Sequence, residues 1–296
     1  LREKEYGIWQ TWSWADTART VRHMACGLAA LGLQRGQNLA LISDNRPHLY
    51  MGFVAAQALG AVPVPLYQDA VAAEMVFVVQ DAEISIAFAE NQEQVDKLLE
   101  VRESVPSIRY IVYDDPRGMR NYDQPGLISM EQLLEKGQAW DKAHPQAWDA
   151  MLGAIQESDV SVILYTSGTT GKPKGVQRDT GGYTVALAAS MEYIYGGKPG
   201  ETFFSTSDIG WVVGHSYIIY GPLIAGMATV MYEGTPLRPD AGIWWQIVEK
   251  YKVSVMFSAP TAVRVLKKQD PAWLKKYDIS TLRYLFLAGE PLDEPT

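Results

Sequence analysis

The sequence predicts an α/β protein with largely parallel sheets and covering helices. Short apolar runs rich in β-branched residues alternate along the chain with segments whose apolar residues recur at helical spacing. Glycine, proline, asparagine and aspartate separate these segments, as they do in turns. Strands and helices that alternate in this way form parallel sheets, so their order indicates the fold class. With 47% hydrophobic and 20% charged residues, the chain has the composition of a globular protein with a large core.

Two capping boxes mark the starts of helices in the first part of the chain. Ser13 and Asp16 form the first, and the helix that it opens carries apolar residues at helical spacing through Leu31 before Gly32. Ser129 and Gln132 form the second. Between them we expect, in order, strand 38–43, a helix from Pro47 to about Gly60, extended 62–66, helix 73–81, strand 84–89, helix 92–101, strand 108–113 and loop 114–128.

The second part of the chain continues the alternation. Residues 211–232 carry no charged side chain, but Gly221, Pro222 and Gly226 interrupt the stretch, so we expect a buried helix followed by a buried strand rather than a membrane span. The expected elements are strand 160–164, helix 180–193, strand 202–205, the 211–232 block, helix 240–251, strand 253–257, helix 261–268 and strand 282–287. We expect one subdomain in residues 1–160 and a second in residues 161–296. Ligands of parallel sheets bind at the carboxyl ends of the strands, so we expect the phosphate loop and the segments 205–208 and 288–291 to converge on one crevice.

Charge and cysteine content exclude some partners. A net charge of -8 without a basic run argues against nucleic acid. The single cysteine, Cys26, can form no internal disulfide, which predicts a small core residue in a cytoplasmic protein. Oligomeric state leaves no signal in the sequence. The chain begins at Leu1 without an initiator methionine or the apolar region of a signal peptide, so its start looks cut.

The loop after the strand at Val160 has the composition of a phosphate-binding loop. Two glycines permit a backbone whose N–H groups turn inward on one anion, while hydroxyls and one lysine add donors and charge. Its spacing differs from that of a Walker A loop, and the lysine is followed by Pro173 rather than by a hydroxyl residue. The residues predicted to bind the phosphates of ATP are Thr166, Ser167, Gly168, Thr169, Thr170, Gly171 and Lys172.

The run from Tyr165 to Gly175 resembles the phosphate-loop signature of adenylate-forming enzymes, the acyl-CoA synthetase superfamily. The resemblance implies the layered α-β-α-β-α large N-terminal domain of that family. It also implies ATP, Mg²⁺ and coenzyme A as cofactor and co-substrates of a reaction in which a carboxylic acid becomes an acyl-adenylate and then an acyl-CoA. No residue is assigned as catalytic or as a metal ligand.

Three later segments resemble acetyl- and propionyl-CoA synthetases. They are residues 178–183, 207–217 and 286–296. The resemblance implies that Val212, Val213 and Ala288 line the acyl pocket and that Gly289, Glu290 and Pro291 contact adenine. His215 is either a pocket residue or a hydrogen-bonded interior histidine. Alanine at 288, where acetate enzymes carry valine, leaves room for about one more methylene, which favours propionate by about 1–3 kcal/mol.

The first 160 residues resemble the long-chain acyl-CoA synthetase branch instead, on the runs 41–47 and 61–67. We therefore expect a mosaic joined at the phosphate loop. We also expect an incomplete chain that lacks the small C-terminal domain of the family, binds ATP weakly and turns over little by itself. The alternatives are a long-chain or aromatic acyl-CoA synthetase and a non-catalytic ATP-binding fragment.

Overall fold

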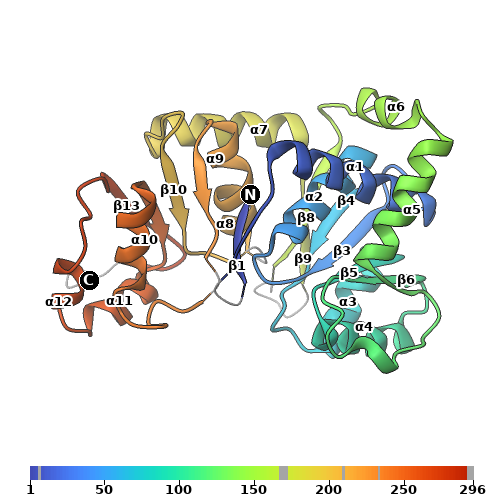
Figure 1. The fold of residues 1–296 in the computed structure, drawn as a ribbon, viewed down its shortest axis with the longest axis horizontal. Coiled ribbons are helices and arrows are strands. Elements are labelled where there is room, and N and C mark those ends of the chain that lie inside the picture. The colour runs from blue at the N-terminus through green and yellow to red at the C-terminus, as the bar shows by residue number, and fades with distance from the viewer. Residues whose placement is uncertain (6–7, 167–172, 209–210, 233, 292–296) are drawn as a thin grey trace. The chain divides into compact units, whose positions relative to one another are not determined.

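The computed structural model describes residues 1–5, 8–166, 173–208, 211–232 and 234–291, and the chain divides into two compact units (Figure 1). The first unit comprises Leu1–Gly182 and the second Tyr183–Thr296. Both contain a parallel sheet with helices on each face, so the predicted α/β class is confirmed. The subdomain boundary at 160/161, which the sequence resemblances suggested, stays a prediction.

The first unit is built on a five-stranded parallel sheet with the strand order β4-β3-β5-β6-β7. Its strands are β3 (Asn38–Ile42), β4 (Val62–Pro65), β5 (Ile86–Ala89), β6 (Tyr110–Tyr113) and β7 (Leu127–Ser129). Its helices are α1 (Trp14–Ala30), α2 (Pro47–Leu59), α3 (Ala72–Asp81), α4 (Gln92–Ser104), α5 (Met130–Ala143), α6 (Ala147–Gly153) and the 3₁₀ turn η1 (Met119–Asn121). The sequence pattern did not predict α6 or η1, and β7 begins inside the segment expected to be a loop.

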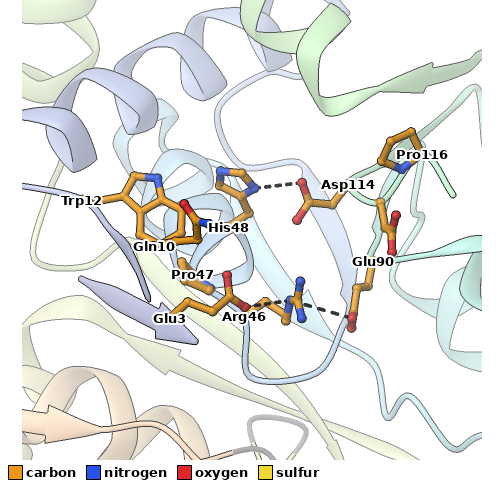
Figure 2. A pocket seen from close by; sticks show the side chains of 10 residues that line it. Glu3, Gln10, Trp12, Arg46, Pro47, His48, Glu90, Asp114 and Pro116 are labelled. Atoms are coloured by element: carbon orange, nitrogen blue, oxygen red, sulfur yellow. Dashed lines mark hydrogen bonds and ion pairs between the residues drawn. The ribbon is translucent and has the colours of Figure 1, made fainter. Parts of the chain in front are cut away.

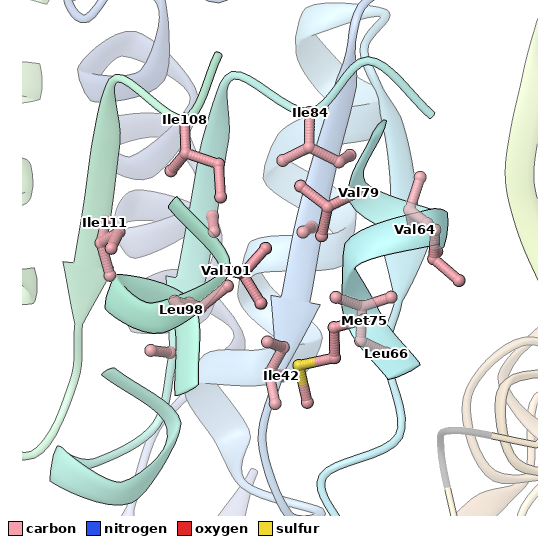
Figure 3. Close-up of a cluster of buried hydrophobic side chains, with 14 of the residues drawn as sticks. Ile42, Val64, Leu66, Met75, Val79, Ile84, Leu98, Val101, Ile108 and Ile111 are labelled. Carbon is pink, nitrogen blue, oxygen red and sulfur yellow. The ribbon is translucent and has the colours of Figure 1, made fainter. Parts of the chain in front are cut away.

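Alternate residues of the strands face opposite layers of helices. Figure 3 shows one face, where Ile42 and Val64 of the sheet meet Met75 of α3 and Leu98 of α4 in one buried cluster. The other face carries Leu39 and packs against α2 and α5, and α1 packs against these two helices. Because helices cover both faces of the sheet, the side chains on both faces of each strand are apolar. These strands therefore appear in the sequence as continuous apolar runs.

Both predicted capping boxes are present. Ser13 and Asp16 exchange the two reciprocal hydrogen bonds at the start of α1, and Ser129 and Gln132 do so at the start of α5. Cys26 lies on α1 with no exposed surface, as predicted for a core residue, and burial raises the pKa of its thiol to about 11.

Two antiparallel pairs were not predicted. β1 (Arg2–Glu5) pairs with β2 (Ile8–Thr11), and β8 (Val160–Thr166) pairs with β9 (Lys174–Asp179). The antiparallel pairing of β8 with β9 is therefore an exception to the largely parallel order that the sequence predicts. The reason is that β1 and β9 are largely polar and lack the apolar pattern that predicts a strand, while β2 begins with Ile8 and Trp9 but is exposed along its length. β8 lies beside the proline-containing edge strand β4, and the Gln57 side chain donates to the carbonyl of Ser161 (2.8 Å).

The second unit is built on a four-stranded parallel sheet with the order β11-β10-β12-β13. Its strands are β10 (Thr202–Ser205), β11 (Ala228–Val230), β12 (Val253–Ser258) and β13 (Tyr284–Leu287). Its helical segments are α7 (Thr180–Ala189), which begins in the first unit, the π-helices η2 (Ser190–Ile194) and η3 (His215–Tyr220), and α8 (Val212–Gly214), α9 (Gly221–Ile224), α10 (Ile243–Tyr251), α11 (Pro260–Lys267) and α12 (Ala272–Lys275).

Two consecutive residues of β10 point into different hydrophobic cores on the two faces of the sheet. Phe203 faces a cluster with Tyr195, Val255 and Phe257, while Phe204 faces Trp244 of α10 on the opposite side. The uncharged block 211–232 forms helical segments α8, η3 and α9 followed by strand β11, which confirms the predicted order of helix and strand. The expected burial of the strand is wrong, because Ala228 is exposed and Thr229 and Val230 are only half-buried at the edge of the sheet. Within the described part of the chain, no helix is both long enough and apolar enough to cross a membrane.

Candidate active site

Three strands of the second unit end side by side at the carboxyl edge of its sheet. The N–H of Thr206, after β10, donates to the carbonyl of Phe257 in β12 (3.0 Å), and the hydroxyls of Thr206 and Ser258 lie 2.7 Å apart. The N–H of Ala288, after β13, donates to the carbonyl of Ser258 (3.2 Å). Ligands of open parallel sheets bind at this edge. The predicted approach of segments 205–208 and 288–291 to one sheet edge is therefore confirmed.

The tip 288–291, which follows β13, is exposed. Gly289 has φ +98°, a left-handed conformation that favours glycine, and a methyl group added to its α-carbon would meet no atom of the described residues within 4 Å. Open space therefore borders the backbone at one of the residues predicted to contact adenine, and a flat ring can approach it without displacing a side chain.

Glu290, another predicted adenine contact, is held by the helix that follows β12. Its Oε1 accepts hydrogen bonds from the backbone N–H of Thr261 (2.7 Å) and from the Thr261 hydroxyl, and its Oε2 accepts one from Arg264 (2.9 Å). Arg264 also donates to the carbonyl of Pro291 (2.9 Å). The hydrogen bonds from Thr261, followed by those from Arg264, lower the pKa of Glu290.

The predicted acyl-pocket residues occupy different environments within the second unit. Val212 is 42% exposed, whereas Val213 packs against the aromatic cluster that contains Tyr195 and Phe257. Phe286, two residues before Ala288, packs against the same cluster, so the structure brings Val213 and β13 to one core. His215, at the start of η3, has no exposed surface, which agrees with the interior reading of this residue.

The phosphate loop falls largely outside the described residues. Ser167, Gly168, Thr169, Thr170, Gly171 and Lys172 are not described. Thr166 ends β8, where its Cα pairs with that of Lys174 in β9. β8 belongs to the first unit, so the expected convergence of the phosphate loop with the two strand ends above stays a prediction.

A polar cavity of about 300 Å³ lies at the carboxyl edge of the sheet in the first unit (Figure 2). Arg46 lies between Glu3 of the β1–β2 hairpin (3.0 Å) and Glu90 after β5 (3.9 Å), and His48 contacts Asp114 after β6 (2.8 Å). Each of these charges has a partner within the protein, so the cavity is a junction that fastens the hairpin to the sheet edge.

The pairing of His48 with Asp114 predicts a pH dependence of stability. Burial opposes the charged imidazole, but the hydrogen bond and charge of Asp114, with the charge of Glu3, raise the pKa of His48 overall. A raised folded-state pKa contributes stability that is fully present below the unfolded value of about 6.5 and is lost as the pH rises through the folded value. We expect His48→Gln to lower the urea midpoint at pH 6 and to have a smaller effect at pH 9.

Asp114→Asn supplies the control, because it removes the partner and leaves the imidazole. In a double-mutant cycle the coupling between the two positions should shrink as the pH rises from 6 to 9. A coupling that is equal at both values would contradict the assignment.

Comparison with known proteins identifies the family. The model of the AMP-binding enzyme family matches residues 3–296. The chain belongs to the AMP-binding enzyme family. Among curated relatives, the propionate–CoA ligase of Escherichia coli is 43% identical over 290 residues, which are 97% of this chain and 46% of that protein. An acetyl-coenzyme A synthetase of Rhodobacter capsulatus is 54% identical over 139 residues, 47% of this chain and 21% of that protein.

A solved acetoacetyl-CoA synthetase from Streptomyces lividans shares the fold, with a TM-score of 0.78 and 22% identity over 96% of this chain and 43% of that one. The match confirms that the α/β architecture is that of this family. The chain spans about half the length of the curated propionate–CoA ligase that it matches.

The similarity to propionate–CoA ligase bears on the mosaic hypothesis. This similarity covers 97% of the chain and therefore includes most of residues 1–160, where the runs 41–47 and 61–67 resemble the long-chain branch. A single relative thus accounts for both parts of the chain. The match gives the idea of two joined ancestries no support.

Two contacts of the candidate site escaped sequence reasoning. Thr261 and Arg264 precede Glu290 by 29 and 26 residues and belong to no motif that the sequence analysis recognised. The available signal was their spacing of three on a predicted helix, which places both side chains near the same face. That spacing says nothing about which partner they meet.

Proposed function

We propose that this member of the AMP-binding family takes part in the ATP-dependent activation of a short-chain carboxylic acid, with propionate favoured, to an acyl-adenylate and then an acyl-CoA. Its whole-chain similarity to propionate–CoA ligase supports the reaction class. The observation that carries the proposal is geometric. Val213 and β13 pack on one core, and β13 leads directly into the small Ala288 and the open backbone at Gly289.

The proposed roles follow the sheet edge. Gly289, Glu290 and Pro291 would border the adenine, and Ala288, Val212 and Val213 would border the acyl chain. Residues 166–172 would hold the β- and γ-phosphates. Mg²⁺ would accompany the phosphates of ATP, with which this ion usually binds.

The chemistry needs positioning and charge neutralisation more than a covalent group from the protein. An oxygen of the carboxylate attacks the α-phosphorus of ATP, and the bond from that phosphorus to the bridging oxygen of pyrophosphate breaks. The thiol sulfur of coenzyme A then attacks the acyl carbon, the bond from that carbon to the phosphate oxygen of AMP breaks, and AMP and the thiol proton leave. Orienting the adenine at the tip and the acid beside Ala288 would fix the line of the first attack.

The proposed partners and compartment are simple. The acid is a small carboxylate, and the cytoplasm is the proposed site of action because the one cysteine is buried and reduced. Neither proposal assigns an oligomeric state.

Ligand binding to the 296-residue chain tests the function. Calorimetry would measure the affinity for ATP alone and with acetate, propionate, butyrate, octanoate or benzoate, since an acid bound beside ATP changes the ATP affinity by the same factor that ATP changes the acid affinity. We expect weak ATP binding that propionate strengthens most. Strengthening by octanoate or benzoate instead would favour the long-chain or aromatic alternative, and ATP binding without any acid effect would favour a non-catalytic module.

A further inference from the structure

The start of α11 and the tip 288–291 are neighbours, because α11 follows β12, the tip follows β13, and these two strands are adjacent in one parallel sheet. β12 and β13 pair in register from Val255 with Tyr284 to Ser258 with Leu287. Two residues beyond Ser258 the chain enters α11, and one residue beyond Leu287 it enters the tip. The helix therefore begins next to the point at which the tip leaves the sheet.

Arg264 bonds to a side chain and to a backbone carbonyl of two consecutive residues of the tip. One guanidinium nitrogen donates to the carboxylate of Glu290 and another donates to the carbonyl of Pro291, both at 2.9 Å. Thr261 holds the second carboxylate oxygen with its backbone N–H and its hydroxyl. A planar guanidinium with fixed donors can satisfy both acceptors in one geometry, whereas a lysine ammonium has no such fork. The tip is thus fixed at its third and fourth residues.

Thr261 and Arg264 together form a clamp on Glu290 and Pro291. Gly289 lies just before these two residues and is exposed. It precedes Glu290, has the left-handed φ of +98° and borders open space. A backbone face with no side chain can bind a flat ring only if its peptide planes stay in place, and preorganisation of this kind raises affinity because less is ordered on binding. Fixing Glu290 and Pro291 fixes the peptide planes on the carboxyl side of Gly289.

We propose that Thr261 and Arg264 are positioning residues that hold the tip 288–291 in the shape that recognises adenine. This inference rests on the proposed function, which places the adenine at Gly289. It adds two residues of α11 to that site, and it predicts that nucleotide selectivity depends on a helix that does not itself contact the base.

The test compares Arg264→Gln, Arg264→Lys, Thr261→Val and Thr261→Ser in the 296-residue chain. Lys267→Gln is the matched control, because it removes a positive charge from the same helix at an exposed position. The probes are ATP, GTP and inorganic tripolyphosphate, whose affinities separate recognition of the base from recognition of the phosphates. Hydrogen exchange of the peptide 284–291 reports on the tip without any nucleotide.

In Arg264→Gln we expect the affinity for ATP to fall about tenfold, as for the loss of one charged hydrogen bond, while the affinity for tripolyphosphate stays unchanged. Exchange of the tip should become faster. Arg264→Lys should fall between Arg264→Gln and the wild type, Thr261→Ser should match the wild type, and Thr261→Val should lose part of the ATP affinity. Lys267→Gln should match the wild type in both measurements.

Equal losses for ATP and tripolyphosphate would overturn the inference, because they would indicate a general effect of charge or folding. Unchanged exchange and unchanged ATP affinity in Arg264→Gln would overturn it as well. A wild-type chain that binds tripolyphosphate but does not distinguish ATP from GTP would overturn the adenine role while leaving phosphate binding intact. A wild-type chain that binds neither ATP nor tripolyphosphate would overturn the proposed function and the adenine role with it, and the exchange rates would then decide alone whether Arg264 holds the tip.

Discussion

Gly137→Ala is expected to destabilise the first unit strongly. Gly137 lies on α5 where this helix packs against α1, and a methyl group on its α-carbon would lie 1.8 Å from the carbonyl oxygen of His23 and 2.8 Å from the backbone nitrogen of Gly27. Gly27 faces the same contact from α1, since its own added methyl would lie 2.5 Å from the carbonyl oxygen of Leu133. Backbone atoms cannot rotate aside as a side chain can, so the two helices would have to separate.

The expected size follows from two opposing effects. Alanine favours a helix over glycine by about 1 kcal/mol. Overpacking of a buried contact costs about 1–3 kcal/mol and occasionally more. Because the added methyl group would clash with backbone atoms of the facing helix, its cost should lie at the upper end of this range. We therefore expect the free energy of unfolding to fall by about 2 kcal/mol or more. Urea unfolding followed by circular dichroism would show it as a lower midpoint.

Gly153→Ala is the matched control. Gly153 is the last residue of α6, and a methyl group there would meet no atom within 4 Å in the described part of the chain, so only the helix preference changes. We expect a midpoint equal to or slightly above that of the wild type, by up to about 1 kcal/mol. Equal midpoints for the two variants would show that α1 and α5 can move apart freely.

This helix contact illustrates what the sequence could predict. Local signals placed α1 and α5, because the capping boxes at Ser13 and Ser129 need only residues three apart. Nothing local shows that Gly27 and Gly137 face each other. Their pairing depends on how two helices more than a hundred residues apart cross one another.

The same distinction separates the predicted from the missed parts of the candidate site. Strand ends are set by apolar runs, so the arrival of Thr206 and Ala288 at one sheet edge could be inferred from the sequence. The clamp on Glu290 could not, because hydrogen bonds from Thr261 and Arg264 depend on the register between β12 and β13. The strand β9 was missed for another reason, since its exposed polar residues take part in a hairpin without the pattern of a buried strand.

Ala288→Val is expected to reverse the preference between propionate and acetate. Ala288 follows β13 at an exposed position, and its backbone N–H bonds to Ser258, a contact that the substitution leaves in place. Two added methyl groups would occupy the space that the proposed function assigns to the end of the acyl chain. One methylene in such a pocket is worth about 1–3 kcal/mol, or roughly tenfold to a hundredfold in relative affinity. The ratio of the propionate to the acetate effect on ATP affinity would measure this change.

Stability separates a pocket effect from a general one. Substitutions at exposed positions usually change stability by less than about 0.5 kcal/mol, so the urea midpoint of Ala288→Val should match that of the wild type. Ala228→Val provides the control, because Ala228 is an exposed alanine at the amino end of β11, at the opposite edge of the same sheet. Its selectivity should not change. If both variants shifted the ratio equally, or if Ala288→Val weakened the two acids alike, the acid would not lie beside residue 288, and the preference for propionate would need another origin.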